Sequence, residues 1–191
     1  MKFIYDEIKI KDNIREMFSA ISYGDIVSGE LWYKSANQWC NEIAEENNTQ
    51  LIKICGITSV MSPMVSWKQN KEYVKAFMKR RKKHTTIQHN KAKRINNTSD
   101  YNEIYNIIGG MKTQAFFDCI YNHKTSRRVV CDRHMITISG QPTKDITTCQ
   151  YKFLEKCYID VANENNILPS TFQCILWNHY RNSNNLNEKY G

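Results

Sequence analysis

The sequence predicts an all-α fold, and three observations favour it. The chain has only seven Gly and three Pro among 191 residues, fewer turn-forming residues than a many-stranded β-protein needs. Hydrophobic residues make up 41% of the chain, which is enough to bury a core. One stretch shows the apolar spacing of a helix face, with intervals of four, three and four residues: Trp32, Ala36, Trp39 and Ile43. We therefore expect one helical domain over residues 1–181 and a polar tail over 182–191.

Helix-breaking residues set the bounds expected in the first half of the chain. We expect an opening helix within residues 1–28 and a turn around Gly24 and Gly29. A short apolar helix, Leu51–Met61, ends at Ser62-Pro63, because proline disfavours the helical conformation of the residue before it. The next helix starts at Ser66-Trp67.

The second half is predicted to be helical as well. Gly109-Gly110 separates a helix over Tyr101–Ile108 from one over Met111–Tyr121, and Val129–Cys131 is a short extended piece before a helix capped by Asp132. Thr143 or Asp145 is expected to cap a long helix, and Pro169-Ser170 opens the last one. Each of these two helices is predicted to turn one face inward: Leu154, Cys157, Tyr158 and Val161 in the first, and Phe172, Ile175, Leu176 and His179 in the second.

The formal net charge of +8 indicates a polyanionic partner. Nucleic acid is the commonest such partner, and a membrane surface is the alternative. No apolar run approaches the length of a membrane span, and the N-terminus lacks the apolar core of a signal peptide. We therefore expect a soluble cytoplasmic protein that binds DNA, with no membrane contact and with its oligomeric state left open.

The seven cysteines favour neither a disulfide framework nor a metal centre. Their number is odd, no pair has the C-x-x-C spacing, and most have apolar neighbours, as Cys55 does. His84, His89 and Cys131 show no metal-ligand spacing either. We expect buried thiols in a reducing compartment and no cofactor.

A run of cations extends from Lys79 through Arg80, Arg81 and Lys82 to Lys83 and is followed by His84. Cations suit the C-terminal end of a helix, so a solvated helix end is one interpretation. Five successive cations exceed what a helix end needs, which favours a phosphate-contacting patch.

The segment 104–138 carries the residues with the clearest chemistry. Its glycines leave the backbone amides of Gly109, Gly110 and Met111 accessible at the start of a helix, where amides and the helix dipole attract a phosphate. Lys112 follows directly, and Asp132 lies in the segment Val-Val-Cys-Asp-Arg-His-Met over 129–135.

This segment resembles the core of the helix-hairpin-helix DNA glycosylases, the superfamily of 8-oxoguanine glycosylase and endonuclease III. The proline of the usual Leu-Pro-Gly-Val-Gly hairpin is absent from Ile107-Ile108-Gly109-Gly110. The resemblance implies a hairpin unit over 101–123, a catalytic segment over 129–139, Lys112 as a nucleophile that forms a Schiff base, and Asp132 as the catalytic carboxylate. A looser resemblance, over Ser62-Pro63, Trp67, Asn70 and 90–92, extends to compact phage-type members linked with modified thymines.

The expected function is that of a DNA N-glycosylase, with abasic-site lyase activity, that excises a damaged or modified base after it leaves the stack. Two alternatives stay open: an enzyme that modifies hypermodified thymine in phage DNA, and a non-catalytic DNA-binding module. Asp132 also suits a purely capping role, and His134 a structural or phosphate-contacting one. Trp67 and Trp177 are interpreted as core residues, with a DNA wedge as the alternative, and Asn70 and Asn90 as capping or loop-orienting residues.

Overall fold

The computed structural model describes residues 2–81 and 83–186, and within these ranges the chain forms ten α-helices and no β-strand. The all-α prediction is confirmed. The helices are α1 (Glu7–Ser19), α2 (Tyr23–Glu46), α3 (Leu51–Met61), α4 (Trp67–Met78), α5 (Thr86–Asn96), α6 (Tyr101–Ile108), α7 (Met111–Tyr121), α8 (Arg133–Ile138), α9 (Thr148–Glu164) and α10 (Pro169–Ser183).

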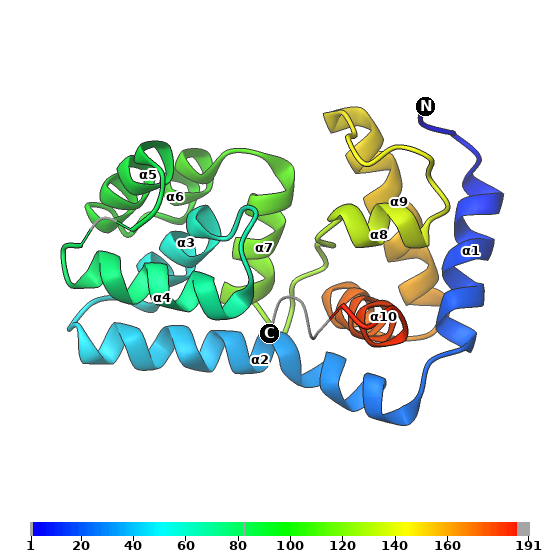
Figure 1. Ribbon diagram of the computed structural model, residues 1–191, viewed down its shortest axis with the longest axis horizontal. Coiled ribbons are helices and arrows are strands. Elements are labelled where there is room, and N and C mark those ends of the chain that lie inside the picture. Colours follow the sequence, from blue (N-terminus) through cyan, green and yellow to red (C-terminus); the bar gives the residue numbers. More distant parts are fainter. Residues whose placement is uncertain (1, 82, 187–191) are drawn as a thin grey trace.

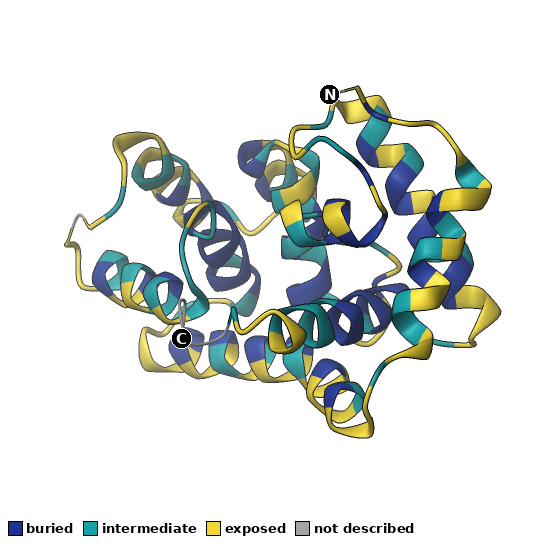
Figure 2. Cartoon of the chain, turned by 45° about the vertical axis from the view of Figure 1, so that its right-hand side comes forward, coloured by how far each residue is buried: buried dark blue, intermediate teal, exposed yellow. Residues whose placement is uncertain are grey.

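The helices form two groups that share the long helix α2 (Figure 1). Helices α3 to α7 lie over one end of α2, and α1, α8, α9 and α10 lie over its other end. Each group has its own hydrophobic core, the first around Ile54 and Phe117 and the second around Tyr158 and Phe172. In Figure 2 the buried residues of each helix face the interior of its own group. The second group therefore combines the N-terminal helix with the last three helices of the chain.

Helix α2 passes without a break through both Gly24 and Gly29, so the predicted turn at these residues is wrong. At Gly29, α10 packs so closely that a Cβ atom would lie 2.5 Å from the Cα atom of Ile175. The glycine thus allows two helix backbones to approach each other. The chain instead turns between α1 and α2, where the side chain of Ser22 caps α2 by accepting a hydrogen bond from the Asp25 amide.

The predicted start of the long helix was also wrong. Thr147, not Thr143 or Asp145, caps α9, and it forms a reciprocal capping box with Gln150. Thr143 and Asp145 lie in the preceding loop, where the Thr143 hydroxyl donates to the Asp145 carbonyl at 3.0 Å. Thr and Asp both cap helices well, so Thr143 and Asp145 were reasonable candidates. Only Thr147 has a Gln three positions later in α9, and this Gln completes the capping box.

Several other predictions on helix bounds are confirmed: the helices over 51–61, 101–108 and 111–121 have the predicted ends, and Ser66 and Asp132 are N-caps. The predicted inward residues of α9, and Phe172, Ile175 and Leu176 of α10, are buried. Helix α5 is mostly polar, and its bounds were not predicted; Asn90, expected to cap or orient a loop, lies inside this helix. Helix α10 continues to Ser183, past the start of the predicted polar tail, whose residues 187–191 lie outside the described residues.

Six of the seven cysteines are buried and Cys149 is exposed, and all seven are free thiols. Burial raises the pKa of the Cys119 thiol to about 12, so this group stays protonated at neutral pH. The prediction of mostly buried thiols is confirmed. No helix in the described part of the chain has the length and apolar character needed to cross a membrane.

Candidate functional site

The turn between α6 and α7 holds two consecutive glycines in backbone conformations that other residues rarely adopt. Gly109 has φ +53° and Gly110 has φ +81°. Two carbonyl groups in the last turn of α6 have side-chain partners, since Lys91 Nζ donates to Ile108 O at 2.6 Å and Gln114 Nε2 donates to Tyr105 O at 3.0 Å. Gly110 caps α7 without a side chain, so no side-chain cap satisfies the first amides of α7, and such amides at a helix N-terminus attract anions.

Two adjoining pockets open between the two groups of helices, and together we call them the groove. The first, here called the aromatic pocket, has a volume of about 360 Å³, and the second, here called the wide pocket, about 790 Å³. Both pockets are lined by Lys112 of α7, by Asp132 at the start of α8, and by Trp177 and Arg181 of α10. The groove is therefore built by both groups of helices.

Asp132 is held in the groove by three hydrogen bonds. Its Oδ1 atom accepts from the amides of His134 and Met135, at 2.9 and 3.0 Å, which is the N-cap arrangement predicted from the sequence. Its Oδ2 atom accepts from the indole Nε1 of Trp177 at 3.0 Å. The Arg181 guanidinium lies 4.4 Å from the centroid of the same indole ring. The cap bonds and the Trp177 indole thus fix the Asp132 carboxylate. A carboxylate that accepts three hydrogen bonds still has a lone pair available for another partner.

His134 lies beside this carboxylate and packs against Tyr180, with ring centroids 5.5 Å apart. Its pKa is lowered, chiefly by burial and further by the charges of Arg133, Arg181 and Lys112, although Asp132 acts in the opposite direction. The ring is therefore neutral at neutral pH. This supports the interpretation of His134 as a packing residue.

The structure brings together most of the residues predicted for the site. Lys112 and Asp132 line both pockets, and Gly110 and Met111 line the wide pocket. Gly109 lies in the same turn and is partly buried, and its carbonyl accepts a hydrogen bond from the Thr113 hydroxyl at 2.7 Å.

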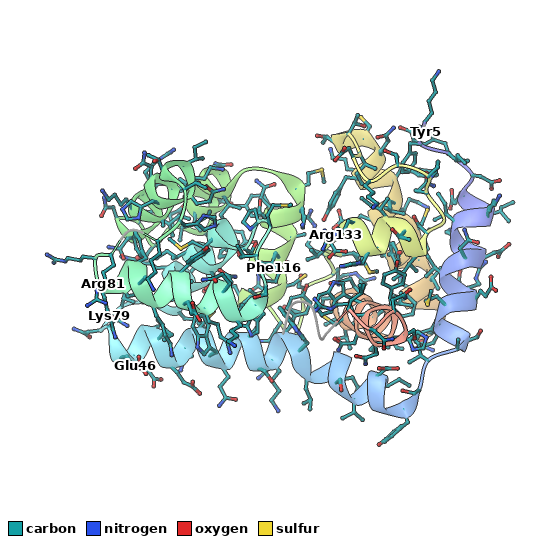
Figure 3. All side chains as sticks on the ribbon, in the orientation of Figure 1. Tyr5, Glu46, Lys79, Arg81, Phe116 and Arg133 are labelled. Atoms are coloured by element: carbon teal, nitrogen blue, oxygen red, sulfur yellow. The ribbon has the colours of Figure 1, made fainter. Side chains whose placement is uncertain are left out.

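The basic run lies elsewhere. Lys79, Arg80, Arg81 and Lys83 are exposed, none of these four lines either pocket, and Lys82 lies outside the described residues. Figure 3 shows Lys79 and Arg81 at the far end of the first group, whereas Phe116 and Arg133 lie at the middle of the molecule. The run therefore forms a separate surface, distant from Lys112 and Asp132.

Sequence reasoning missed two parts of the groove. The first is a set of cations that line the wide pocket together with Lys112: Arg133, Lys144 and Arg181. The second is an aromatic wall, in which the ring of Trp32 lies 5.4 Å from Trp67, 5.9 Å from Phe116 and 6.3 Å from Trp177. Trp67 and Trp177 are thus partly buried wall residues of a pocket, not simply core. The residues of this wall come from four helices, and no spacing in the sequence relates them.

No group of three or more His, Cys, Asp or Glu side chains in the described ranges is arranged to hold a metal ion. The charged groups of the groove are instead two lysines, two arginines and two carboxylates: Lys112, Lys144, Arg133, Arg181, Asp132 and Asp145.

The fold and the groove define an all-helical protein with a cationic, aromatic-walled site between two groups of helices. The chain belongs to a family of unknown function, DUF7178, whose family model matches residues 5–184. The match extends over both groups of helices. Searches of curated proteins and of solved structures gave no match.

Proposed function

We propose that this protein is a helix-hairpin-helix DNA N-glycosylase with abasic-site lyase activity, which binds an extruded damaged or modified base in the groove and uses Lys112 as its nucleophile. The observation that carries the proposal is the position of Lys112 and Asp132. They lie on different groups of helices and line the same two pockets. The resemblance of residues 104–138 to glycosylase cores assigns catalytic roles to the same two residues.

The chemistry requires an amine at the sugar. The Nζ atom of Lys112, as the neutral amine, attacks C1′, and the glycosidic bond breaks with its electron pair departing on the base, which takes up a proton. Opening of the sugar ring and loss of the amine proton give an imine between Nζ and C1′. Lys112 is exposed and lines the wide pocket, so it is accessible to a sugar that is still attached to the DNA backbone.

Asp132 suits the complementary role. A carboxylate at the sugar stabilises the positive charge that develops as the base leaves, and it accepts the proton of an attacking amine. Its bonds to the His134 and Met135 amides and to the Trp177 indole fix its position before DNA binds. A fixed carboxylate needs little reorganisation during the reaction.

The surroundings of the groove suit a DNA backbone. The uncapped amides at the start of α7 favour a phosphate, and Arg133, Lys144 and Arg181 add positive charge along the wide pocket. Met64 lines the same pocket, is 93% exposed and has φ +64°, a rare conformation for a residue of its type. An exposed apolar side chain at this place is suited to fill the gap that an extruded base leaves.

Borohydride trapping on a duplex with a single abasic site tests the proposal. The amine condenses with the sugar aldehyde, water leaves, and borohydride reduces the imine to a stable protein–DNA adduct. We expect an adduct with the wild-type chain and none with Lys112→Gln, which should still bind the duplex. An adduct of equal yield in Lys112→Gln contradicts the assignment of the nucleophile.

Mass analysis of duplexes with modified bases separates the alternatives. Release of a free base supports a glycosylase, whereas a base of altered mass that stays in the strand indicates a base-modifying enzyme. Salt-sensitive binding with neither product indicates a DNA-binding module.

A further inference from the structure

The aromatic pocket is walled by flat apolar rings but also contains two buried side-chain amides. Trp32, Trp67, Phe116 and Trp177 provide the rings, and Asn70 of α4 and Gln173 of α10 provide the amides. The two amides come from opposite groups of helices. A pocket with a mostly aromatic wall and a few converging polar groups is the usual form of a site for a planar heterocycle.

Asn70 carries an acceptor that the protein leaves without a partner. Its residue is 2% exposed, and its Nδ2 atom donates to the carbonyl of Thr58 at 3.1 Å. Because a carbonyl only accepts, this bond assigns the other amide atom as oxygen. The Oδ1 atom is buried and has no hydrogen-bond partner among the described residues. A buried acceptor without a partner is costly to the folded protein and calls for a reason.

Gln173 offers the opposite group. It is 4% exposed, and its Oε1 atom accepts from the hydroxyl of Tyr33 at 2.9 Å. With the oxygen engaged, the Nε2 amide remains as a hydrogen-bond donor on the pocket wall. These two buried amides therefore give the pocket one acceptor and one donor, in addition to the partly buried Asp132 and Asn178 in its lining.

We propose that the aromatic pocket selects bases with a lactam edge, in which a ring N–H adjoins a carbonyl, as in uracil-type pyrimidines and hypoxanthine-type purines. Asn70 Oδ1 accepts from the ring N–H after a small local shift, and Gln173 Nε2 donates to the carbonyl, while the aromatic side chains pack on the ring. This assignment gives Asn70 a role in specificity in place of the loop-orienting role expected from the sequence. It rests on the proposed function, because it takes the extruded base as the ligand.

The number of hydrogens decides between the two kinds of base edge. A ring N–H has one hydrogen, which the single free acceptor of Asn70 satisfies. The exocyclic amino group of cytosine or adenine has two hydrogens, and only one of them is paired by Asn70. An unpaired N–H among aromatic rings opposes binding, so the amino-edged bases are disfavoured.

Binding of free nucleosides tests the selectivity without any need for catalysis. Saturation-transfer NMR compares deoxyuridine with deoxycytidine, and deoxyinosine with deoxyadenosine, since the bases of each pair differ only in this edge. We expect the lactam member of each pair to bind about tenfold more tightly, the effect of one buried hydrogen bond. In Asn70→Leu we expect this preference to disappear.

Asn37→Leu is the matched control, because Asn37 also donates to a backbone carbonyl, that of Ile120 at 3.0 Å, but does not line the aromatic pocket. It should keep the wild-type preference. Equal binding of both members by the wild-type chain, tighter binding of the amino member, or no binding of any of the four nucleosides overturns the proposal. If Asn70→Leu fails to fold, Asn70→Ala replaces it, with the same loss of preference expected.

Trapping at an abasic site separates this inference from the proposed function. An abasic site has no base, so Asn70→Leu should give an adduct within about twofold of wild type while it loses release of uracil or hypoxanthine from DNA. If the wild-type chain gives no adduct, the proposed function fails, and the nucleoside measurement still decides the selectivity. If the adduct forms and release of either base is unchanged in Asn70→Leu, the role of Asn70 is refuted.

Discussion

The groove and the basic run are both rich in positive charge, but they hold their cations differently. In the groove, Lys112, Arg133 and Arg181 come from three helices in the two groups and line the same pocket as the fixed carboxylate of Asp132. In the run, the described residues Lys79, Arg80, Arg81 and Lys83 are all exposed and follow one another closely after α4. A high density of charge along the sequence therefore marks a solvated surface here. The groove is chemically distinctive because its charged side chains come from helices that are distant in the sequence.

The largest expected difference between the two regions is in covalent trapping. Lys112→Gln should abolish the borohydride adduct at an abasic site, because no other amine is assigned to attack the sugar. A variant with Gln at Lys79, Arg80, Arg81 and Lys83 should keep the adduct within about twofold of wild type when duplex is saturating. Loss of the adduct in the second variant would mean that the run, not the groove, contains the reactive amine.

The next prediction separates the two roles of Asp132. Asn caps a helix about as well as Asp does, but its Nδ2 atom cannot accept from the Trp177 indole, so Asp132→Asn should lower the free energy of unfolding by about 1–2 kcal/mol. Single-turnover base release should fall by about a hundredfold or more, because the neutral amide neither stabilises a developing cation nor accepts a proton. Release at the wild-type rate would leave Asp132 with capping as its role.

The turn that positions Lys112 should be sensitive to a single methyl group. A Cβ on Gly110 meets only Thr113 Oγ1, at 3.4 Å, so the cost of Gly110→Ala comes from its φ of +81°. We expect a loss of about 1–2 kcal/mol in the free energy of unfolding, measured by urea denaturation.

Gly24→Ala is the matched control, because Gly24 lies inside α2 and its added Cβ would have open space, with Ser22 Oγ at 3.8 Å. It should stabilise the protein by about 0.5–1 kcal/mol. Equal effects of the two substitutions would show that the turn is not strained for alanine.

A smaller difference is expected in the salt dependence of DNA binding. If Arg133 contacts a phosphate at the groove, Arg133→Gln should reduce the slope of log affinity against log salt by about one. Arg81→Gln, in the run, should leave the slope close to that of wild type. Fluorescence anisotropy over a salt series measures both, and the reverse ranking would place the DNA on the run.

The smallest expected effect concerns His134. Because burial lowers its pKa below the ordinary value of 6.5, the unfolded chain takes up this proton at a higher pH than the folded protein does. Stability contributed by the neutral ring is therefore present above that value and is lost as the pH falls below it. Between about pH 7.5 and about pH 5.5, wild type should lose more unfolding free energy than His134→Gln. An identical pH profile would show that His134 does not titrate differently on folding.

Local features of the sequence predicted much of this structure. Helices α3, α6 and α7 begin and end where breakers and glycines placed their bounds, and Asp132 caps α8 as expected. The failures were of a different kind. Gly29 was predicted to lie in a turn, but a glycine is needed there because Ile175 on α10 packs against it. Ile175 lies 146 positions further along the chain, so the local sequence does not show this contact. A glycine that admits a neighbouring helix and a glycine that ends one have the same appearance in a sequence.

The sequence by itself determined the helical fold class, the bounds of α3, α6 and α7, and the two residues on which the proposed chemistry depends, Lys112 and Asp132. These follow from periodicity, capping and a local motif, all of which act over a few neighbouring residues. Only the tertiary structure decided which charges share a site, how Trp177 fixes Asp132, and that Asn70 and Gln173 face one aromatic pocket. The physical reason is that these contacts join segments brought together by burial of two separate cores, and burial leaves no fixed spacing along the chain.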